Sequence, residues 1–193
     1  MRSKRKIHVA LIYGSTRPGR FCDIVAEWAA GEIAAREGFT LDVIDPAKFD
    51  PSGAAASATV PVPTLAVRIG RADAIVVVTP EYNHSYPAAL KSLIDSLKDE
   101  WQAKPIAFVS YGGLSGGVRA VEQLRLVFAE LHAVTIRDAV SFANAWDQFD
   151  GNGELHEPDR PRRSMAVMLA SLRWWAGALR YARQIAPYSS RAA

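Results

Sequence analysis

The chain has 193 residues, 49% hydrophobic and 22% charged, which fits one compact domain and excludes disorder throughout. Its formal net charge of +3 is mildly basic without a dominant basic stripe, so nucleic-acid binding is not expected. The single cysteine, Cys22, excludes an internal disulfide framework and a cluster of thiolate metal ligands.

No apolar run reaches the eighteen residues that a transmembrane helix needs, so no membrane partner is expected. Residues 1–6 are basic like the start of a signal peptide, but the apolar run after them is too short for one. A lone cysteine suits a reducing compartment. These features together predict a cytoplasmic protein.

The first half of the chain begins with a near-continuous apolar run at residues 7–13, which is typical of a strand covered on both faces. Residues 21–36 have apolar side chains at helical spacing, and Gly38 can close that helix. A second strand is expected at residues 40–45. Residues 46–63 are rich in proline and small side chains, which predicts a long loop without regular structure.

The second half continues this alternation of strands and helices. Its expected elements are a buried strand at 72–79, a helix at 87–97, a strand at 105–111, a helix at 118–131, a broken strand at 134–136 and 140–142, and a last helix at 161–184. Such alternation predicts a five-stranded parallel sheet with helices on both faces. Ligands of such sheets bind at the carboxyl ends of the strands, where three unusual loops of this chain meet.

The first of these loops, residues 14–20, reads Gly-Ser-Thr-Arg-Pro-Gly-Arg and leads into a helix. Amide groups at a helix N-terminus attract anions. Ser15 and Thr16 add hydroxyl groups, and Arg17 and Arg20 add guanidinium groups that match phosphate oxygens. The loop therefore predicts a phosphate site, although a tight turn with solvent-exposed arginines remains the plain alternative.

Two familiar phosphate motifs fail at this loop. Its two glycines have Walker spacing, but Arg20 and Phe21 replace the lysine and hydroxyl residue that hold a triphosphate and magnesium. The dinucleotide fingerprint fails because Thr16 stands where glycine is required, although Asp45 imitates the ribose-binding acid. A nucleoside triphosphatase is therefore not expected, and dinucleotide binding is a weak alternative.

The second loop, residues 79–87, reads Thr-Pro-Glu-Tyr-Asn-His-Ser-Tyr-Pro and is preorganised by its prolines. Pro80 and Tyr82 offer a flat apolar wall, while Asn83 and the backbone amides can hydrogen-bond the edge of a planar heteroaromatic ring such as isoalloxazine. A rigid turn that caps the next helix is the structural alternative. For His84, a surface role is favoured over catalysis.

The third loop, residues 111–117, contains four glycines in seven residues. Glycine allows a ligand to approach the backbone closely, so this loop can pass along the second edge of the same ring. A flexible connection is the alternative, but four glycines would then cost conformational entropy without any gain in binding.

In this order and spacing the three loops resemble the NADPH-dependent FMN reductase family of the flavodoxin-like fold, which includes chromate, azo-dye and quinone reductases. The resemblance covers about residues 6–142 and is most specific at residues 79–91. It implies a single flavodoxin-like domain over residues 1–193, a three-layer α/β sandwich with strand order 2-1-3-4-5. It also implies FMN as the cofactor and NADPH or NADH as the co-substrate.

The resemblance further implies which residues bind FMN. Contacts to the phosphate are expected from Ser15, Thr16, Arg17, Arg20 and the amides near Phe21 and Cys22. Contacts to the ring are expected from Pro80, Glu81, Tyr82, Asn83, His84, Tyr111, Gly112 and Gly113. Many relatives carry serine at the position of Arg20 and serine or asparagine near Cys22, so the phosphate contacts here depart from the family pattern.

The expected function is FMN-dependent oxidation of NAD(P)H by a ping-pong route, with electrons passed to a quinone, an azo dye, a metal oxyanion or free flavin. The flavin carries the chemistry, so no catalytic acid or base and no metal is assigned. Tyr82 and His84 are candidates for stacking on the nicotinamide or acceptor. The alternatives are a flavodoxin-type electron carrier, which the basic charge disfavours, and an apo interaction or regulatory module.

Residues 165–181 carry apolar side chains around much of the last helix, which indicates burial on more than one side. Packing on the chain's own core and contact with a second subunit both explain this pattern. The family resemblance implies a homodimer or homotetramer. The several arginines between residues 160 and 183 fit a solvated or intersubunit face better than a nucleic-acid surface.

Overall fold

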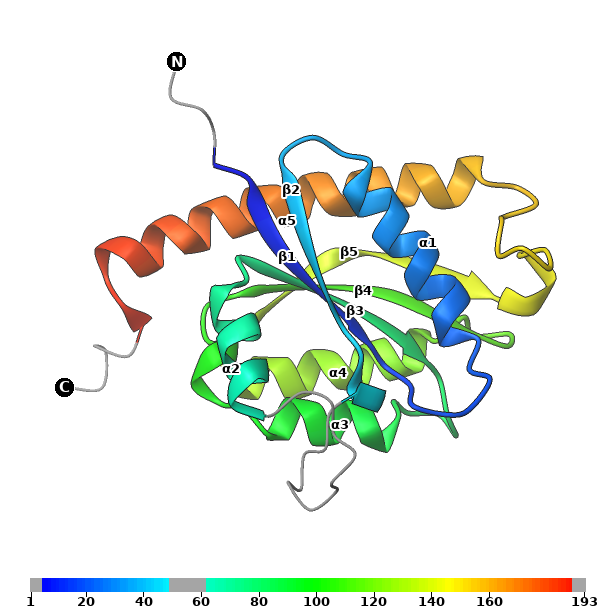
Figure 1. Ribbon diagram of the computed structural model, residues 1–193, viewed down its shortest axis with the longest axis horizontal. Coiled ribbons are helices and arrows are strands. Elements are labelled where there is room, and N and C mark those ends of the chain that lie inside the picture. Colours follow the sequence, from blue (N-terminus) through cyan, green and yellow to red (C-terminus); the bar gives the residue numbers. More distant parts are fainter. Residues whose placement is uncertain (1–4, 49–61, 189–193) are drawn as a thin grey trace.

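The computed structural model describes residues 5–48 and 62–188, in which helices cover both faces of one central sheet (Figure 1). The strands are β1 (Ile7–Tyr13), β2 (Phe39–Ile44), β3 (Ala74–Pro80), β4 (Pro105–Gly112) and β5 (Val134–Ala143). The α-helices are α1 (Cys22–Ala34), α2 (Val62–Arg71), α3 (Ala88–Asp95), α4 (Val118–Glu130) and α5 (Asp159–Ile185). Three short 3-10 helices are η1 (Pro46–Lys48), η2 (Asp99–Trp101) and η3 (Ala145–Asp147).

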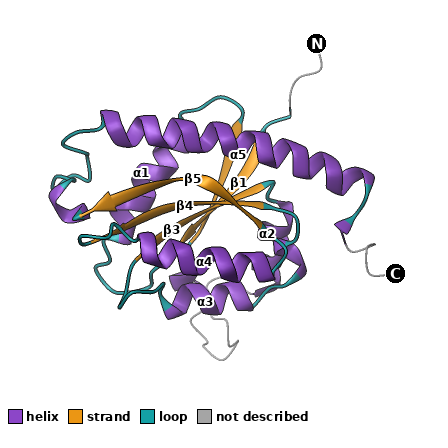
Figure 2. Ribbon diagram, turned by 180° about the vertical axis from the view of Figure 1, so that it is seen from behind, coloured by secondary structure: helices purple, strands orange, loops and turns teal. Residues whose placement is uncertain are grey.

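The five strands pair in parallel in the order β2-β1-β3-β4-β5, which confirms the expected flavodoxin-like topology. Helices α1 and α5 cover one face of the sheet, and α2, α3 and α4 cover the other (Figure 2). All seven residues of β3 are buried, because β3 is the central strand of a sheet that helices cover on both faces. In this strand order β1, β3 and β4 are neighbours, so their carboxyl ends lie next to one another.

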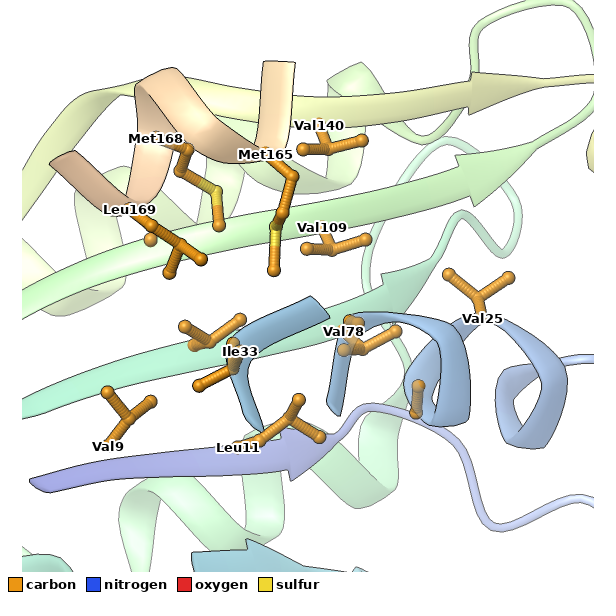
Figure 3. Close-up of a cluster of buried hydrophobic side chains, with 14 of the residues drawn as sticks. Val9, Leu11, Val25, Ile33, Val78, Val109, Val140, Met165, Met168 and Leu169 are labelled. Atoms are coloured by element: carbon orange, nitrogen blue, oxygen red, sulfur yellow. The ribbon is translucent and has the colours of Figure 1, made fainter. Parts of the chain in front are cut away.

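The core under α5 explains the apolar residues on one face of the last helix. Met165, Met168 and Leu169 lie over Val109 and Val140 of the sheet (Figure 3). These helix residues are at most 1% exposed, so one face of α5 belongs to the core of its own chain. The distal part of α5 runs on past the sheet (Figure 1).

Two expectations about elements are corrected. The fifth strand is continuous, because a register irregularity opposite residues 106–108 absorbs the polar residues Arg137 and Asp138 that suggested a break. The expected loop at 46–63 contains η1 and the start of α2, while residues 49–61 lie outside the described residues. Helix α2 is held by Leu65 and Ile69, which lie one turn apart and are buried.

Within the described residues, no helix has the length and apolar character needed to span a membrane.

Candidate functional site

The three loops meet at the carboxyl edge of the sheet because their strands are neighbours. The Gly14 N–H donates to the Val78 carbonyl at 2.7 Å, and a Cβ on Gly14 would lie only 2.6 Å from that oxygen. Only glycine therefore lets the end of β1 approach β3 this closely. The Glu81 N–H donates to the Tyr111 carbonyl at 3.2 Å, which joins the loops after β3 and β4.

The start of α1 presents backbone donors at the first loop. The amide N–H groups of Phe21 and Cys22 have no hydrogen-bond partner among the described residues. The buried Ser15 and the exposed Thr16 place hydroxyl-bearing residues beside them. Free amides at a helix N-terminus together with hydroxyl groups form a donor set that suits a phosphate monoester.

Arg20, which was expected to contact the phosphate, pairs with two carboxylates of the same chain. Its guanidinium donates to both oxygens of Asp45 at 2.8 and 2.6 Å, and its Nε donates to Asp23 at 2.8 Å. The side chain is 9% exposed and also donates to the Ser15 carbonyl. Arg20 therefore ties the first loop to the end of β2, and a phosphate would have to compete with two carboxylates for it.

The same pair sets the protonation of Asp45. Burial opposes ionisation of this carboxyl, but hydrogen bonds from the Arg20 guanidinium and the Ala47 N–H outweigh burial and lower its pKa. The hydrogen bond with Asp45 in turn raises the pKa of Arg20. Both groups stay charged as a pair, so Asp45 is occupied by Arg20 rather than open to a ribose.

Arg17 differs from Arg20 because it is exposed and pairs with no carboxylate in the described part of the chain. Its guanidinium lies over the Tyr82 ring, 3.6 Å from the centroid. The Tyr82 hydroxyl in turn lies 2.7 Å from Ser15 Oγ. Tyr82 therefore connects the first loop to the second, and the Arg17 guanidinium lies over the Tyr82 ring rather than beside a carboxylate.

The second loop makes a tight turn at its tip. Tyr82 and Ser85 exchange backbone hydrogen bonds of 2.9 and 3.0 Å, while Asn83 and His84 both have positive φ, at 49° and 72°. Non-glycine residues seldom adopt this conformation, and its cost is offset only where the surroundings hold it. Both tip residues are exposed, and Gln123 of α4 donates to the His84 carbonyl at 2.9 Å.

Glu81, which was expected near the ring, is enclosed by donors from the third loop and α4. Its carboxylate accepts hydrogen bonds from the Ser115 hydroxyl at 2.8 Å, the Arg119 N–H at 3.2 Å and the Arg119 guanidinium at 2.8 Å. Burial opposes ionisation, but these hydrogen bonds prevail and lower the pKa of Glu81. The geometry makes Glu81 a brace between two loops.

The third loop needs glycine for steric reasons. Gly117 has a φ of +83°, and a Cβ there would lie 2.9 Å from backbone atoms of Tyr111. Gly112 is buried and Gly113 half-buried beside it, while Pro80 is buried at the end of β3. The backbone of the third loop is thus packed tightly along the edge where the second loop also ends.

Phe21, Cys22 and Tyr111 pack beneath the first loop. The Phe21 ring lies 6.0 Å from that of Tyr111 and 5.8 Å from that of Phe149. Burial raises the pKa of the Cys22 thiol, which keeps it protonated and makes it a poor nucleophile. Burial likewise raises the pKa of Tyr111. These side chains support the site from below.

Sequence reasoning did not assign several residues that complete this site. They are Ser85, Ser115, Arg119, Gln123, Trp146 and Phe149. Ser85 and Ser115 lie within the second and third loops, Arg119 and Gln123 lie in α4, and only their partners in the fold reveal the roles of these four residues. The last two follow β5, whose carboxyl end lies at the same edge as the three loops.

The family model described as NADPH-dependent FMN reductase matches residues 7–147. The chain is 36% identical to the NAD(P)H-dependent FMN reductase C4B3.06c of Schizosaccharomyces pombe, over 56% of this chain and 60% of that one. The match thus spans less than two thirds of that relative. The NAD(P)H:quinone oxidoreductase of Solanum tuberosum is 33% identical, over 88% of this chain and 93% of its own length.

A solved structure with the same fold is the flavoenzyme NAD(P)H:(acceptor) oxidoreductase FerB of Paracoccus denitrificans. Its TM-score is 0.70 at 21% identity, with 88% of this chain and 97% of that chain covered. That likeness supports the fold, and the family match, which includes all three loops, supports the relationship. The chain therefore belongs to the NADPH-dependent FMN reductase family of flavodoxin-like oxidoreductases.

Proposed function

We propose that this protein binds FMN and uses it to oxidise NAD(P)H and reduce a quinone or a related acceptor. The observation that carries the proposal is the donor corner at the start of α1, where the Phe21 and Cys22 amides have no partner among the described residues, in the same loop as Arg17, which pairs with no carboxylate there. This corner suits the phosphate of a mononucleotide, and the two loops that can flank a flat ring adjoin it.

Each loop has a role in this proposal. Ser15, Arg17 and the amides of Phe21 and Cys22 hold the phosphate, with Thr16 at the rim. Residues 80–84 and 111–113 lie along the ring. Arg20 and Glu81 hold the loops in place through their own carboxylate or donor partners. The chain thereby supplies position and electrostatics rather than an acid–base group.

When bound, FMN supplies two-electron chemistry, so that NAD(P)H and the acceptor use the exposed ring in turn by a ping-pong route. The names of the potato and fission yeast relatives support a quinone or flavin as the acceptor. Reducing equivalents from NAD(P)H and the lone, buried Cys22 both suit a reducing, cytoplasmic setting.

Flavin binding can be tested through the phosphate. We expect R17A to weaken FMN binding about 10- to 100-fold, because a charge-assisted hydrogen bond is lost. Riboflavin, which has no phosphate, should bind R17A and the wild type equally. Fluorescence titration with both flavins measures these affinities.

The matched control is R137A, since the Arg137 side chain is 95% exposed on β5 and distant from the first loop in the sequence. Wild-type protein that takes up no FMN would overturn the proposal. Steady-state oxidation of NADPH and NADH with a naphthoquinone then separates an enzyme from a flavodoxin-type carrier, which would not turn over.

A further inference from the structure

The segment after β5 is fixed at both ends to the loops assigned to FMN. Asn144 has a φ of 46°, and its N–H donates to the Gly113 carbonyl at 2.9 Å. At the other end, the buried Phe149 packs against Phe21 and, at 5.2 Å, against Phe142. The intervening η3 is therefore held rigidly at the carboxyl edge of the sheet.

Trp146 is exposed at the middle of this fixed segment. The side chain is 56% exposed, although Ala145 beside it is fully buried. Its Cη2 atom lies 3.7 Å from the point that a Cβ on Gly113 would occupy, so the indole borders the third loop. Leu114, the next residue of that loop, is 89% exposed. An apolar rim therefore adjoins the proposed flavin site.

The other exposed tryptophans are arranged differently. Trp174 and Trp175 on α5 lie 5.1 Å apart in an edge-to-face pair and thus contact one another. In the described part of the chain, Trp146 has no aromatic ring as a partner. An exposed indole that is held in place and borders the third loop presents a flat face on which another aromatic ring can stack.

We propose that Trp146 is the stacking surface for a planar aromatic electron acceptor and sets the preference of the enzyme for such acceptors. This inference rests on the proposed function, because it places the acceptor beside FMN. An indole stacks on a quinone-sized ring but offers little to a compact inorganic ion. The adjacent Asp147 is exposed and further disfavours anionic acceptors.

The experiment compares W146A and W146F with W174A, whose side chain is also exposed, at 66%, but lies on α5. The FMN-loaded proteins are titrated with naphthalene-2-carboxamide, a planar ligand that accepts no electrons here, by calorimetry. Kinetics are measured with 1,4-naphthoquinone and with ferricyanide.

We expect W146A to raise the Kd of the carboxamide and the KM of the naphthoquinone roughly 2- to 12-fold, the equivalent of one aromatic pair. The KM of ferricyanide should stay unchanged, W146F should retain most of the affinity, and W174A should match the wild type. FMN affinity should be equal in all four proteins.

The outcomes separate this inference from the proposed function. A wild type that does not bind FMN overturns the proposed function and this inference with it. Normal FMN binding with unchanged carboxamide and naphthoquinone constants in W146A overturns only the role of Trp146. If sedimentation shows that W146A lowers the oligomeric state without changing those constants, the rim contacts a second copy and the inference is wrong.

Discussion

Two arginines in one seven-residue loop have different partners, and sequence alone did not separate them. Arg17 is exposed and lies over a tyrosine ring, whereas Arg20 is nearly buried between Asp45 and Asp23. The pattern of the loop suggests that both bind phosphate because both carry the right charge. The distinction depends on Asp45, which the fold brings to the loop from the end of β2.

We expect R20A to lower the free energy of unfolding by on the order of 3 kcal/mol, because it leaves the Asp45 carboxylate buried without its partner. K91A is the control, since Lys91 pairs with Asp95 on the surface and should contribute less than about 1 kcal/mol. Urea denaturation measures both. Equal losses in the two variants would contradict the structural role given to Arg20.

At the scale of elements, the C-terminus of α2 is capped by Lys104, a buried lysine that directly precedes β4. The Lys104 ammonium donates to the carbonyls of Ile69 and Gly70, the latter at 2.9 Å, and so satisfies the last turn of α2. Burial, reinforced by the nearby Arg183, lowers the pKa of Lys104 to about 8. This helix was not expected from the sequence, and its support comes from a residue some thirty-five positions away.

The lowered pKa predicts a stability that rises with pH. Between about pH 8 and pH 10.5 the folded protein has lost the Lys104 proton while the unfolded chain keeps it, so deprotonation favours the folded state. Relative to K104M, wild-type stability should increase by on the order of 3 kcal/mol over that range. Urea denaturation of both proteins at pH 7 and pH 10 tests this, and parallel pH profiles would contradict it.

At the scale of the whole molecule, the five-stranded parallel sheet was predictable because apolar runs alternate with helical segments along the chain, and its strand order followed from the family resemblance. The continuous β5 was not predictable, because Arg137 and Asp138 look like a break and only pairing with β4 reveals the irregularity. The hydrogen bonds that surround Glu81 and the position of Trp146 beside Gly113 could not be predicted either, because they are contacts between elements distant in sequence. Binding of FMN by the individual loop residues stays a prediction.

The exposed C-terminal part of α5 is a candidate contact surface between copies of this chain. The core-facing residues of α5 are accounted for, but Tyr181 and Ile185, near its C-terminal end, are each at least 64% exposed. We propose that this apolar end contacts another copy in a homodimer or homotetramer. Y181E should then lower the mass measured by sedimentation, because a buried charge disfavours the contact, while FMN affinity stays unchanged. R163E on the same helix is the matched control, and an unchanged mass in Y181E would contradict the proposal.

The close approach at Gly14 has a genetic consequence. Every amino acid that a single-base change can put in place of glycine carries a Cβ, and at this position the Cβ would meet the Val78 carbonyl, a backbone atom that cannot rotate away. A missense change in that codon would therefore separate the end of β1 from β3 and displace the loop beyond it. The Gly14 codon thus decides whether the first loop lies at the carboxyl edge of the sheet, next to the second and third loops.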